Sequence, residues 1–168
     1  MKKNFIILSV LFFISSCTNP DHSLFIEAES FSNTGGWVVD PQFVEQMGSP
    51  YHLAHGLGKP VADAVTEVSV PEAGKYHVWA RTMNWAPGEW EAPGRFKIIV
   101  NDKPLRNVLG TEEGWDWQYA GAINIKDTIV FLKLQDLTGF EGRCDAVFLS
   151  KTKKSPPDDP AELRTWRL

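Results

Sequence analysis

The chain has 168 residues, a formal net charge of −4, and 43% hydrophobic and 12% aromatic residues. A chain of this length is typical of one globular domain that can bury its own core. Because the charge balance is acidic and no basic stripe is present, nucleic acid is excluded as the expected partner.

The first residues have the pattern of an export signal. Two lysines precede the apolar run Phe5–Ile14, which is too short to span a bilayer as a helix. The following Ser15-Ser16-Cys17 makes this region resemble a bacterial lipobox, which implies that Cys17 is lipidated after cleavage. We therefore expect a lipoprotein signal peptide at 1–16 and an exported protein anchored to a bacterial membrane, on either its periplasmic or its surface side. An ordinary signal peptide that contains a cysteine is the alternative.

A polar tether is expected at 17–23, followed by short strands separated by turn residues. Their spacing predicts an all-β jelly-roll sandwich over 24–150. The predicted strands are Leu24–Ser30, Ala64–Val70, Lys75–Thr82, Arg95–Val100, Leu105–Leu109, Gln118–Ile123, Thr128–Leu134 and Cys144–Ser150. Gly35–Pro60 is expected to be a long loop with a helical turn around Pro41–Met47. The charged, proline-containing stretch at 151–168 predicts a linker or tail.

Strand parity predicts which loops lie together. In an up-and-down series of antiparallel strands, every second connection lies at the same end. The loops Met83–Gly94, Gly110–Trp117 and Asp136–Arg143 should therefore meet. That end would collect Trp85, Trp90, Trp115, Trp117 and Phe140, with Glu89, Glu91, Asp116, Asp136 and Arg143 among them.

These tryptophans have two interpretations. Sugar rings stack on exposed aromatic side chains, while carboxylates and an arginine such as Arg143 bond the hydroxyl groups. Alternatively, loop tryptophans fold inward and cap the core, and we expect about two of the four to do so. The prediction is a ligand-binding platform formed by Trp85, Trp90, Trp115 and Trp117 together with Arg143.

Two glutamates near the start of the domain could share a cation. Residues two apart on a strand project from the same face, so Glu27 and Glu29 would lie side by side. Ca²⁺ binds carboxylate and carbonyl oxygens, and Asp145 could supply a third carboxylate. A pair of solvated glutamates on an edge strand is the alternative.

Several short motifs carry a family resemblance. They are Ile26-Glu-Ala-Glu29, the segment Gly74–Arg81, a hairpin around Asn101-Asp102, and the closing segment Cys144–Leu149. Together they resemble the calcium-containing, galactose-binding-like carbohydrate-binding modules. The resemblance implies a jelly roll over Leu24–Ser150 and a structural Ca²⁺ held by Glu27, Glu29 and Asp145.

Three other segments, Gly36–Asp40, Gly48–Gly56 and Asp136–Asp145, resemble a narrower group. This group is the N-terminal β-sandwich module of secreted bacterial FAD-dependent oxidoreductase-like proteins. In these proteins, a flavin domain follows a linker similar to Leu163–Leu168. No Gly-x-Gly-x-x-Gly motif is present, so we expect no FAD in this chain.

The leading hypothesis is a non-catalytic carbohydrate-binding lipoprotein whose partner is a glycan or polysaccharide. A protein-interaction module and an accessory front end of a larger oxidoreductase-like protein, with a companion enzyme or a missing C-terminal domain, are the alternatives. His52 and His55 lack a third zinc ligand at useful spacing. No Gly-x-Ser-x-Gly motif is present, and Cys144 is expected to be a small core residue.

Overall fold

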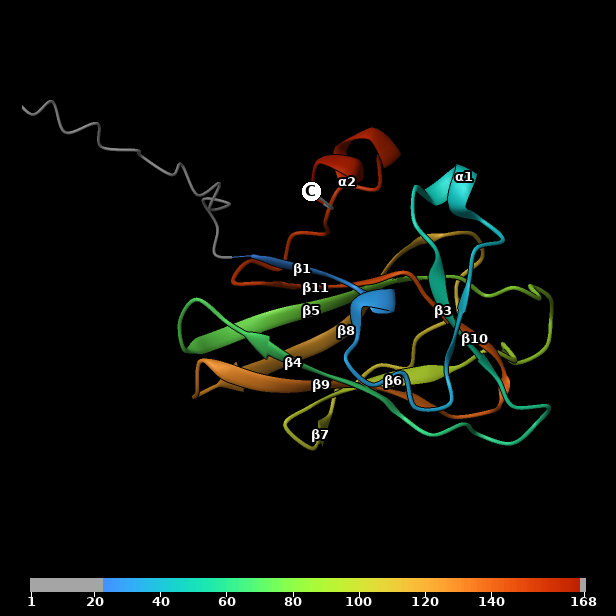
Figure 1. The fold of residues 1–168 in the computed structure, drawn as a ribbon, viewed down its shortest axis with the longest axis horizontal. Coiled ribbons are helices and arrows are strands. Elements are labelled where there is room, and N and C mark those ends of the chain that lie inside the picture. Colours follow the sequence, from blue (N-terminus) through green and yellow to red (C-terminus); the bar gives the residue numbers. More distant parts are fainter. Residues whose placement is uncertain (1–22, 167–168) are drawn as a thin grey trace, which may run out of the picture.

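A computed structural model of the chain describes residues 23–166, which form three antiparallel sheets and a few short helical segments (Figure 1). The prediction of an all-β sandwich is confirmed. The predicted signal peptide and Cys17 lie outside the described residues. No helix within residues 23–166 is long and apolar enough to cross a membrane.

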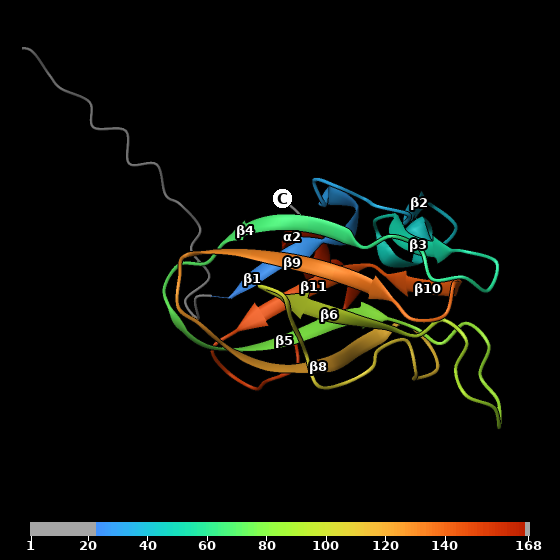
Figure 2. The same ribbon diagram turned by 90° about the horizontal axis from the view of Figure 1, so that it is seen from below.

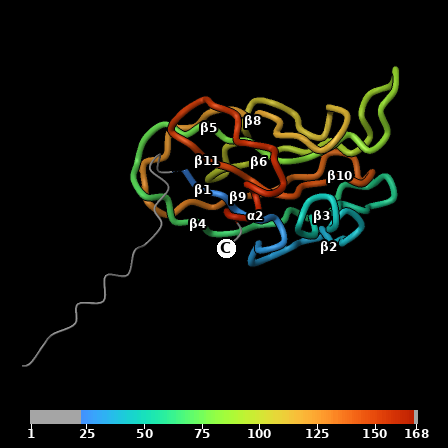
Figure 3. Tube along the Cα trace, turned by 90° about the horizontal axis from the view of Figure 1, so that it is seen from above, coloured from blue at the N-terminus to red at the C-terminus, as the bar shows by residue number. Residues whose placement is uncertain are grey.

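Two four-stranded sheets form the layers of the sandwich (Figure 2). In order, the first contains β1 (Leu24–Glu27), β11 (Ala146–Ser150), β5 (Gly74–Thr82) and β8 (Asp116–Ile125). The second contains β4 (Ala64–Ser69), β9 (Ile129–Asp136), β6 (Phe96–Val100) and β7 (Lys103–Pro104). A third sheet of β10 (Phe140–Cys144), β3 (Tyr51–His55) and β2 (Val38–Asp40) lies at one end (Figure 3).

The core lies between the two large sheets because alternating apolar side chains project inward from both. Tyr76, Val78 and Ala80 of β5 are fully buried, as are Ile98 of β6 and Leu134 of β9. They belong to one cluster of buried apolar residues. Removing this apolar surface from water is the main favourable contribution to folding.

The loops that strand parity places together do meet. The Asn84 amide donates to the Glu112 carbonyl at 2.7 Å, and the Leu137 amide donates to the Arg95 carbonyl at 3.0 Å. The loop that follows β5 extends from the same end as β3 and β10 (Figure 1). The parity prediction is confirmed for these three connections.

The third sheet departs from the sequence-based expectation. Gly35–Pro60 contains β2, β3 and the predicted helical turn, α1 (Val44–Met47), instead of one long loop. The strand pattern is weak because β2 has only three residues, and both Val38 and Val39 are exposed. The sequence pattern did not predict β10 either, because this strand contains Gly142 and has an irregular register between Phe140 and Gly142.

Two strand predictions need correction. Leu105–Leu109 is not a strand; it follows the short β7, and only isolated hydrogen bonds join it to β6. The predicted first strand ends at Glu27, where the chain turns into the 3₁₀ helix η1 (Ala28–Ser30). The Ser30 hydroxyl donates to the Glu27 carbonyl at 2.7 Å and stabilises this turn. Glu27 and Glu29 therefore do not project from one strand face.

The segment after Ser150 packs on the outer face of the first sheet. Its helix α2 (Pro160–Trp166) lies across β1 and β11 (Figure 1). Leu163 of α2 is fully buried among Trp117, Ala146 and Phe148. The Trp117 indole also donates to the Pro157 carbonyl at 2.9 Å. The predicted linker is thus, as far as Trp166, part of the packed domain.

Candidate functional site

The four tryptophans of the predicted platform divide into two exposed and two buried side chains. Trp85 is 37% exposed and Trp90 is 65% exposed. Trp115 and Trp117 are only 9% and 5% exposed. About two of the four were expected to fold inward, and Trp115 and Trp117 do so, which reduces the platform to Trp85 and Trp90.

Trp115 and Trp117 are buried because each has a chain segment packed over it. Trp115 lies edge-on to Tyr51, with ring centroids 5.1 Å apart, in a cluster that includes Met47 of α1. Trp117 lies on the outer face of the first sheet, beneath the C-terminal segment that contains Leu163. Neither ring offers an open face for stacking.

Trp85 is held in a fixed orientation. Its indole N–H donates to the carbonyl oxygen of Phe140, 2.9 Å away on β10. The Arg143 guanidinium lies over the ring, 5.6 Å from its centroid, and Arg143 is only 7% exposed. A cation over an aromatic ring is an attractive contact. Because Arg143 covers one side of the indole, the exposed area of Trp85 belongs to the rest of the ring.

Two more exposed rings come from the same end of the sandwich. Trp90 is fixed within its own loop, since its indole donates to the Ala86 carbonyl at 2.9 Å. Phe140 is 51% exposed and rests against the backbone of Gly58. We call Trp85, Trp90 and Phe140 the aromatic surface.

Polar groups adjoin the aromatic surface. Glu141 adopts a left-handed φ of 58°, uncommon for a residue other than glycine. Its carboxylate lies 3.3 Å from the His55 imidazole and accepts a hydrogen bond of 3.3 Å from Arg143. Sequence reasoning placed Phe140 at this end but did not single out Glu141 or join it to His55, because their contact depends on the unrecognised pairing of β10 with β3.

Arg143 also connects this surface to the interior. Burial raises the pKa of Tyr51 to about 12, helped by a hydrogen bond to Asp40 and opposed by the nearby Arg143 charge. The Tyr51 hydroxyl donates to Asp40 at 3.0 Å. Because Arg143 is buried and lies over the Trp85 ring, it supports that ring, and little of it is accessible to a ligand.

Close backbone contacts bring the tryptophan loop against β10. A side-chain carbon on Gly94 would lie 2.7 Å from the Glu141 carbonyl oxygen, so only glycine fits there without displacement. Asp136 fixes the neighbouring turn, accepting 3.0 Å hydrogen bonds from the amides of Thr138 and Gly139. Asp136 is therefore structural rather than part of a ligand surface.

The three predicted cation ligands come from neighbouring segments. The Ala28 amide, between Glu27 and Glu29, donates to the Asp145 carbonyl at 2.8 Å. The fully buried Asp145 carboxylate accepts hydrogen bonds from the Ser49 hydroxyl at 2.8 Å and from Arg81 at 3.2 Å.

Two of these carboxylates act on the thiol of Cys144, the neighbour of Asp145 in the chain. Burial raises the pKa of the Cys144 thiol well above its usual value, and the charges of Asp145 and Glu29 raise it further. An oxygen donor set of three carboxylates suits Ca²⁺. Within residues 23–166, no three acidic, histidine or cysteine side chains are grouped as a metal site.

His52 and His55 do not act together. They lie three residues apart on β3, so they project from opposite faces. His52 is fully buried, and burial lowers its pKa to about 4. The exposed His55 pairs with Glu141 instead.

The fold belongs to the jelly-roll class found in carbohydrate-binding modules. One similar structure is a β-(1,4)-mannanase from Podospora anserina that includes a family 35 carbohydrate-binding module, with a TM-score of 0.62 and 17% identity. The match covers 82% of this chain but 29% of the mannanase, so the chain spans less than a third of that protein.

Isolated modules match over nearly their whole length. A family 35 module from Clostridium thermocellum has a TM-score of 0.58 and 17% identity, covering 76% of this chain and 96% of the module. The C-terminal family 6 module of a Zobellia galactanivorans laminarinase has a TM-score of 0.56 and 19% identity, covering 77% and 99%. No family model and no curated protein matches the sequence.

Proposed function

We propose that this protein is a non-catalytic carbohydrate-binding module that holds a glycan or polysaccharide on the aromatic surface. The observation that carries the proposal is the fixed, partly exposed ring of Trp85, flanked by the exposed rings of Trp90 and Phe140. A ring already held in place loses little conformational entropy when a sugar stacks on it. The carbohydrate-binding modules among the similar structures support the same function.

The polar groups around the rings favour a sugar over a protein partner. Glu141 and His55 lie beside Phe140 and can bond hydroxyl groups of a stacked sugar. Protein-binding surfaces have an apolar centre depleted of such charges. Binding without turnover fits this geometry because the Glu141 carboxylate is engaged by His55 and Arg143, whereas glycoside hydrolysis requires a pair of positioned carboxyl groups.

A glycan array probed with the purified protein tests this function. We expect binding to one group of related glycans, and loss of that binding in Trp85→Ala. Phe131→Ala is the matched control, because Phe131 is a 49% exposed aromatic side chain on β9 of the second sheet, outside the aromatic surface. Absence of binding to any glycan, or equal binding by wild type and Trp85→Ala, would contradict the proposal.

A structural calcium ion is the second part of the proposal. Glu27, Glu29 and Asp145 would hold it, since carboxylate oxygens are the ligands that Ca²⁺ prefers. A cation that binds only the folded state stabilises that state by mass action. We expect EDTA to lower the melting temperature of the protein and added Ca²⁺ to restore it.

Two variants make the calcium test specific. Glu29→Gln should remove most of the EDTA sensitivity, whereas Glu67→Gln, on the exposed face of β4, should retain it. A melting curve unchanged by EDTA would show that the carboxylates hold no stabilising cation. Loss of calcium would leave the glycan proposal standing if array binding persisted.

Export and anchoring through Cys17 form the third part, with the glycan held near a companion enzyme at a bacterial membrane. The basic start and the Ile14-Ser-Ser-Cys17 segment support it. Cys17→Ser should release the protein from the membrane fraction or block its processing. Normal membrane association of this variant would contradict lipidation at Cys17.

A further inference from the structure

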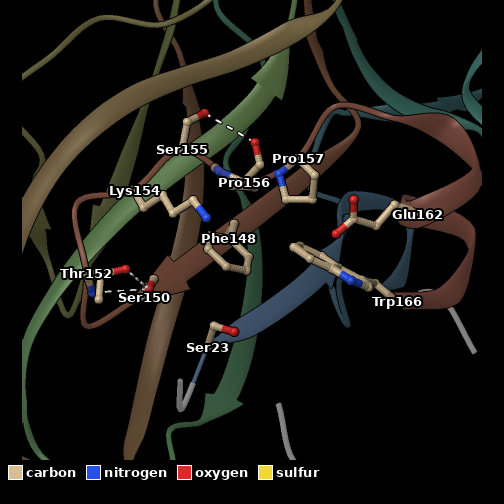
Figure 4. A pocket seen from close by; sticks show the side chains of 10 residues that line it. All are labelled: Ser23, Phe148, Ser150, Thr152, Lys154, Ser155, Pro156, Pro157, Glu162 and Trp166. Carbon is tan, nitrogen blue, oxygen red and sulfur yellow. Dashed lines mark hydrogen bonds between the residues drawn. The ribbon is translucent and has the colours of Figure 1, made fainter. Parts of the chain in front are cut away.

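A cavity lies between the C-terminal segment and the first sheet, away from the aromatic surface. Its volume is about 200 Å³, and its lining includes Phe148, Ser150, Lys154, Pro157, Glu162 and Trp166. Figure 4 shows these side chains arranged around one space. Pockets for drug-sized ligands measure roughly 300–1,000 Å³, so this one suits a single small ring.

The indole of Trp166 forms one wall of this cavity and is held in place by the buried ring of Phe148. The rings of Phe148 and Trp166 stack with centroids 5.4 Å apart and planes inclined by 22°. Burial of Leu163 fixes α2 on the sheet. The Asp158 carboxylate, one residue beyond Pro157, accepts a 2.7 Å hydrogen bond from the buried Arg81 guanidinium. The cavity is therefore preformed by the packed tail.

The cavity also has opposite charges on its two sides. Lys154 extends toward Phe148, and the Glu162 carboxylate projects from α2 beside Trp166 (Figure 4). Within residues 23–166, neither Lys154 nor Glu162 forms an ion pair. The neighbouring Lys151, in contrast, pairs with Glu72. The Lys154 ammonium is thus available to an anionic group, and Glu162 to a hydroxyl donor.

We propose that this cavity is a second ligand site, for a small hydroxylated ring that carries one carboxylate. The ring packs on the partly exposed indole of Trp166, its carboxylate pairs with Lys154, and a hydroxyl group donates to Glu162. Both a sugar acid and a phenolic acid have this chemistry. The site is independent of the aromatic surface and of the proposed glycan function.

An NMR titration of the purified protein tests the site with three probes: methyl glucuronide, 4-hydroxybenzoate and the neutral methyl glucoside. We expect at least one acid to shift the backbone amides of Phe148, Lys154 and Glu162, and the neutral glucoside to leave them unchanged. The acid that binds identifies the source of the ligand. Failure of both acids would overturn the proposal, as would equal shifts with the neutral glucoside.

Variants locate the interaction. Lys154→Met keeps the aliphatic stem but removes the charge, and should weaken acid binding roughly tenfold or more, as expected for a hydrogen bond to a charged group. Lys154→Arg should retain binding, and Lys153→Met is the matched control, since Lys153 lies over Tyr119 instead. Acid binding that survives Lys154→Met, or that is abolished by Trp85→Ala, would overturn the assignment of the site.

Discussion

Two groups of aromatic side chains project from this sandwich, and the chain covers only one of them. Trp117 and Phe148, on the outer face of the first sheet, lie beneath α2 and are nearly buried. Trp85 and Trp90, at the end of the sandwich, remain exposed. The residue types are alike, so tryptophan content alone does not distinguish a ligand surface from a core.

The covering segments explain the difference. The C-terminal segment provides Leu163 as an apolar anchor and Pro157 as an acceptor for the Trp117 indole. The tryptophan loop instead contains Pro87, Gly88 and Glu89, which are all exposed and so do not cover the rings. An exposed aromatic group that is rigid but uncovered is the better candidate for ligand binding.

The largest expected effect comes from uncovering the packed aromatic group. Leu163→Ala removes a fully buried side chain and should lower the free energy of unfolding by about 2–5 kcal/mol. Chemical denaturation monitored by tryptophan fluorescence measures it. Leu57→Ala, at an 81% exposed position, should change stability by less than about 0.5 kcal/mol. Similar stability of both variants would mean that the C-terminal helix is not packed on the sheet.

The buried histidine His52 makes the stability of the protein depend on pH. The pKa of His52 is lowered to about 4 in the folded protein, against 6.5 for the ordinary side chain. The stabilising contribution is therefore complete above pH 6.5 and is lost as the pH falls toward 4, because only the unfolded chain then binds the proton. The loss is on the order of 3 kcal/mol.

Denaturation between pH 7 and pH 4 measures this contribution. His52→Leu should show a flatter pH dependence of stability than wild type, whereas Leu57→Ala, which removes no titratable group, should keep the wild-type slope. An unchanged slope in His52→Leu would show that His52 is not a neutral, buried group.

A smaller effect is expected on binding at the exposed group. Trp85→Ala should weaken glycan binding by about 1–3 kcal/mol while leaving the melting temperature nearly unchanged. Isothermal titration with a glycan identified on the array, together with a melting curve, separates binding from folding. A variant that loses stability but binds normally would place Trp85 with the covered aromatic side chains.

The sequence patterns predict the large sheets better than the third sheet. Long alternating strands such as β5 contain enough residues to show their period. β2 has three residues, and β10 contains a glycine and a left-handed Glu141, so neither has a clear period. Their pairing through β3 brings Glu141 to His55 at the candidate site, which is why that contact was not predicted.

The placement of the loops could be inferred from the sequence, but which of their tryptophans are buried could not. Parity brought Trp85 and Trp115 to one end, because it depends only on strand order. Whether each ring is covered depends on packing partners distant in the chain, such as Tyr51 for Trp115 and Leu163 for Trp117. The packing of the segment 151–166 on the sheet was not predicted, because its prolines and charges are typical of linkers.

Mapping a bound glycan by NMR tests the central claim most directly. With an oligosaccharide identified on the array, we predict that the largest amide and indole shifts occur at Trp85, Trp90 and the Phe140–Glu141 segment. Trp117, under α2, should be unaffected. Shifts confined to the covered aromatic group, or absent from Trp85, would contradict the claim that the aromatic surface holds the glycan.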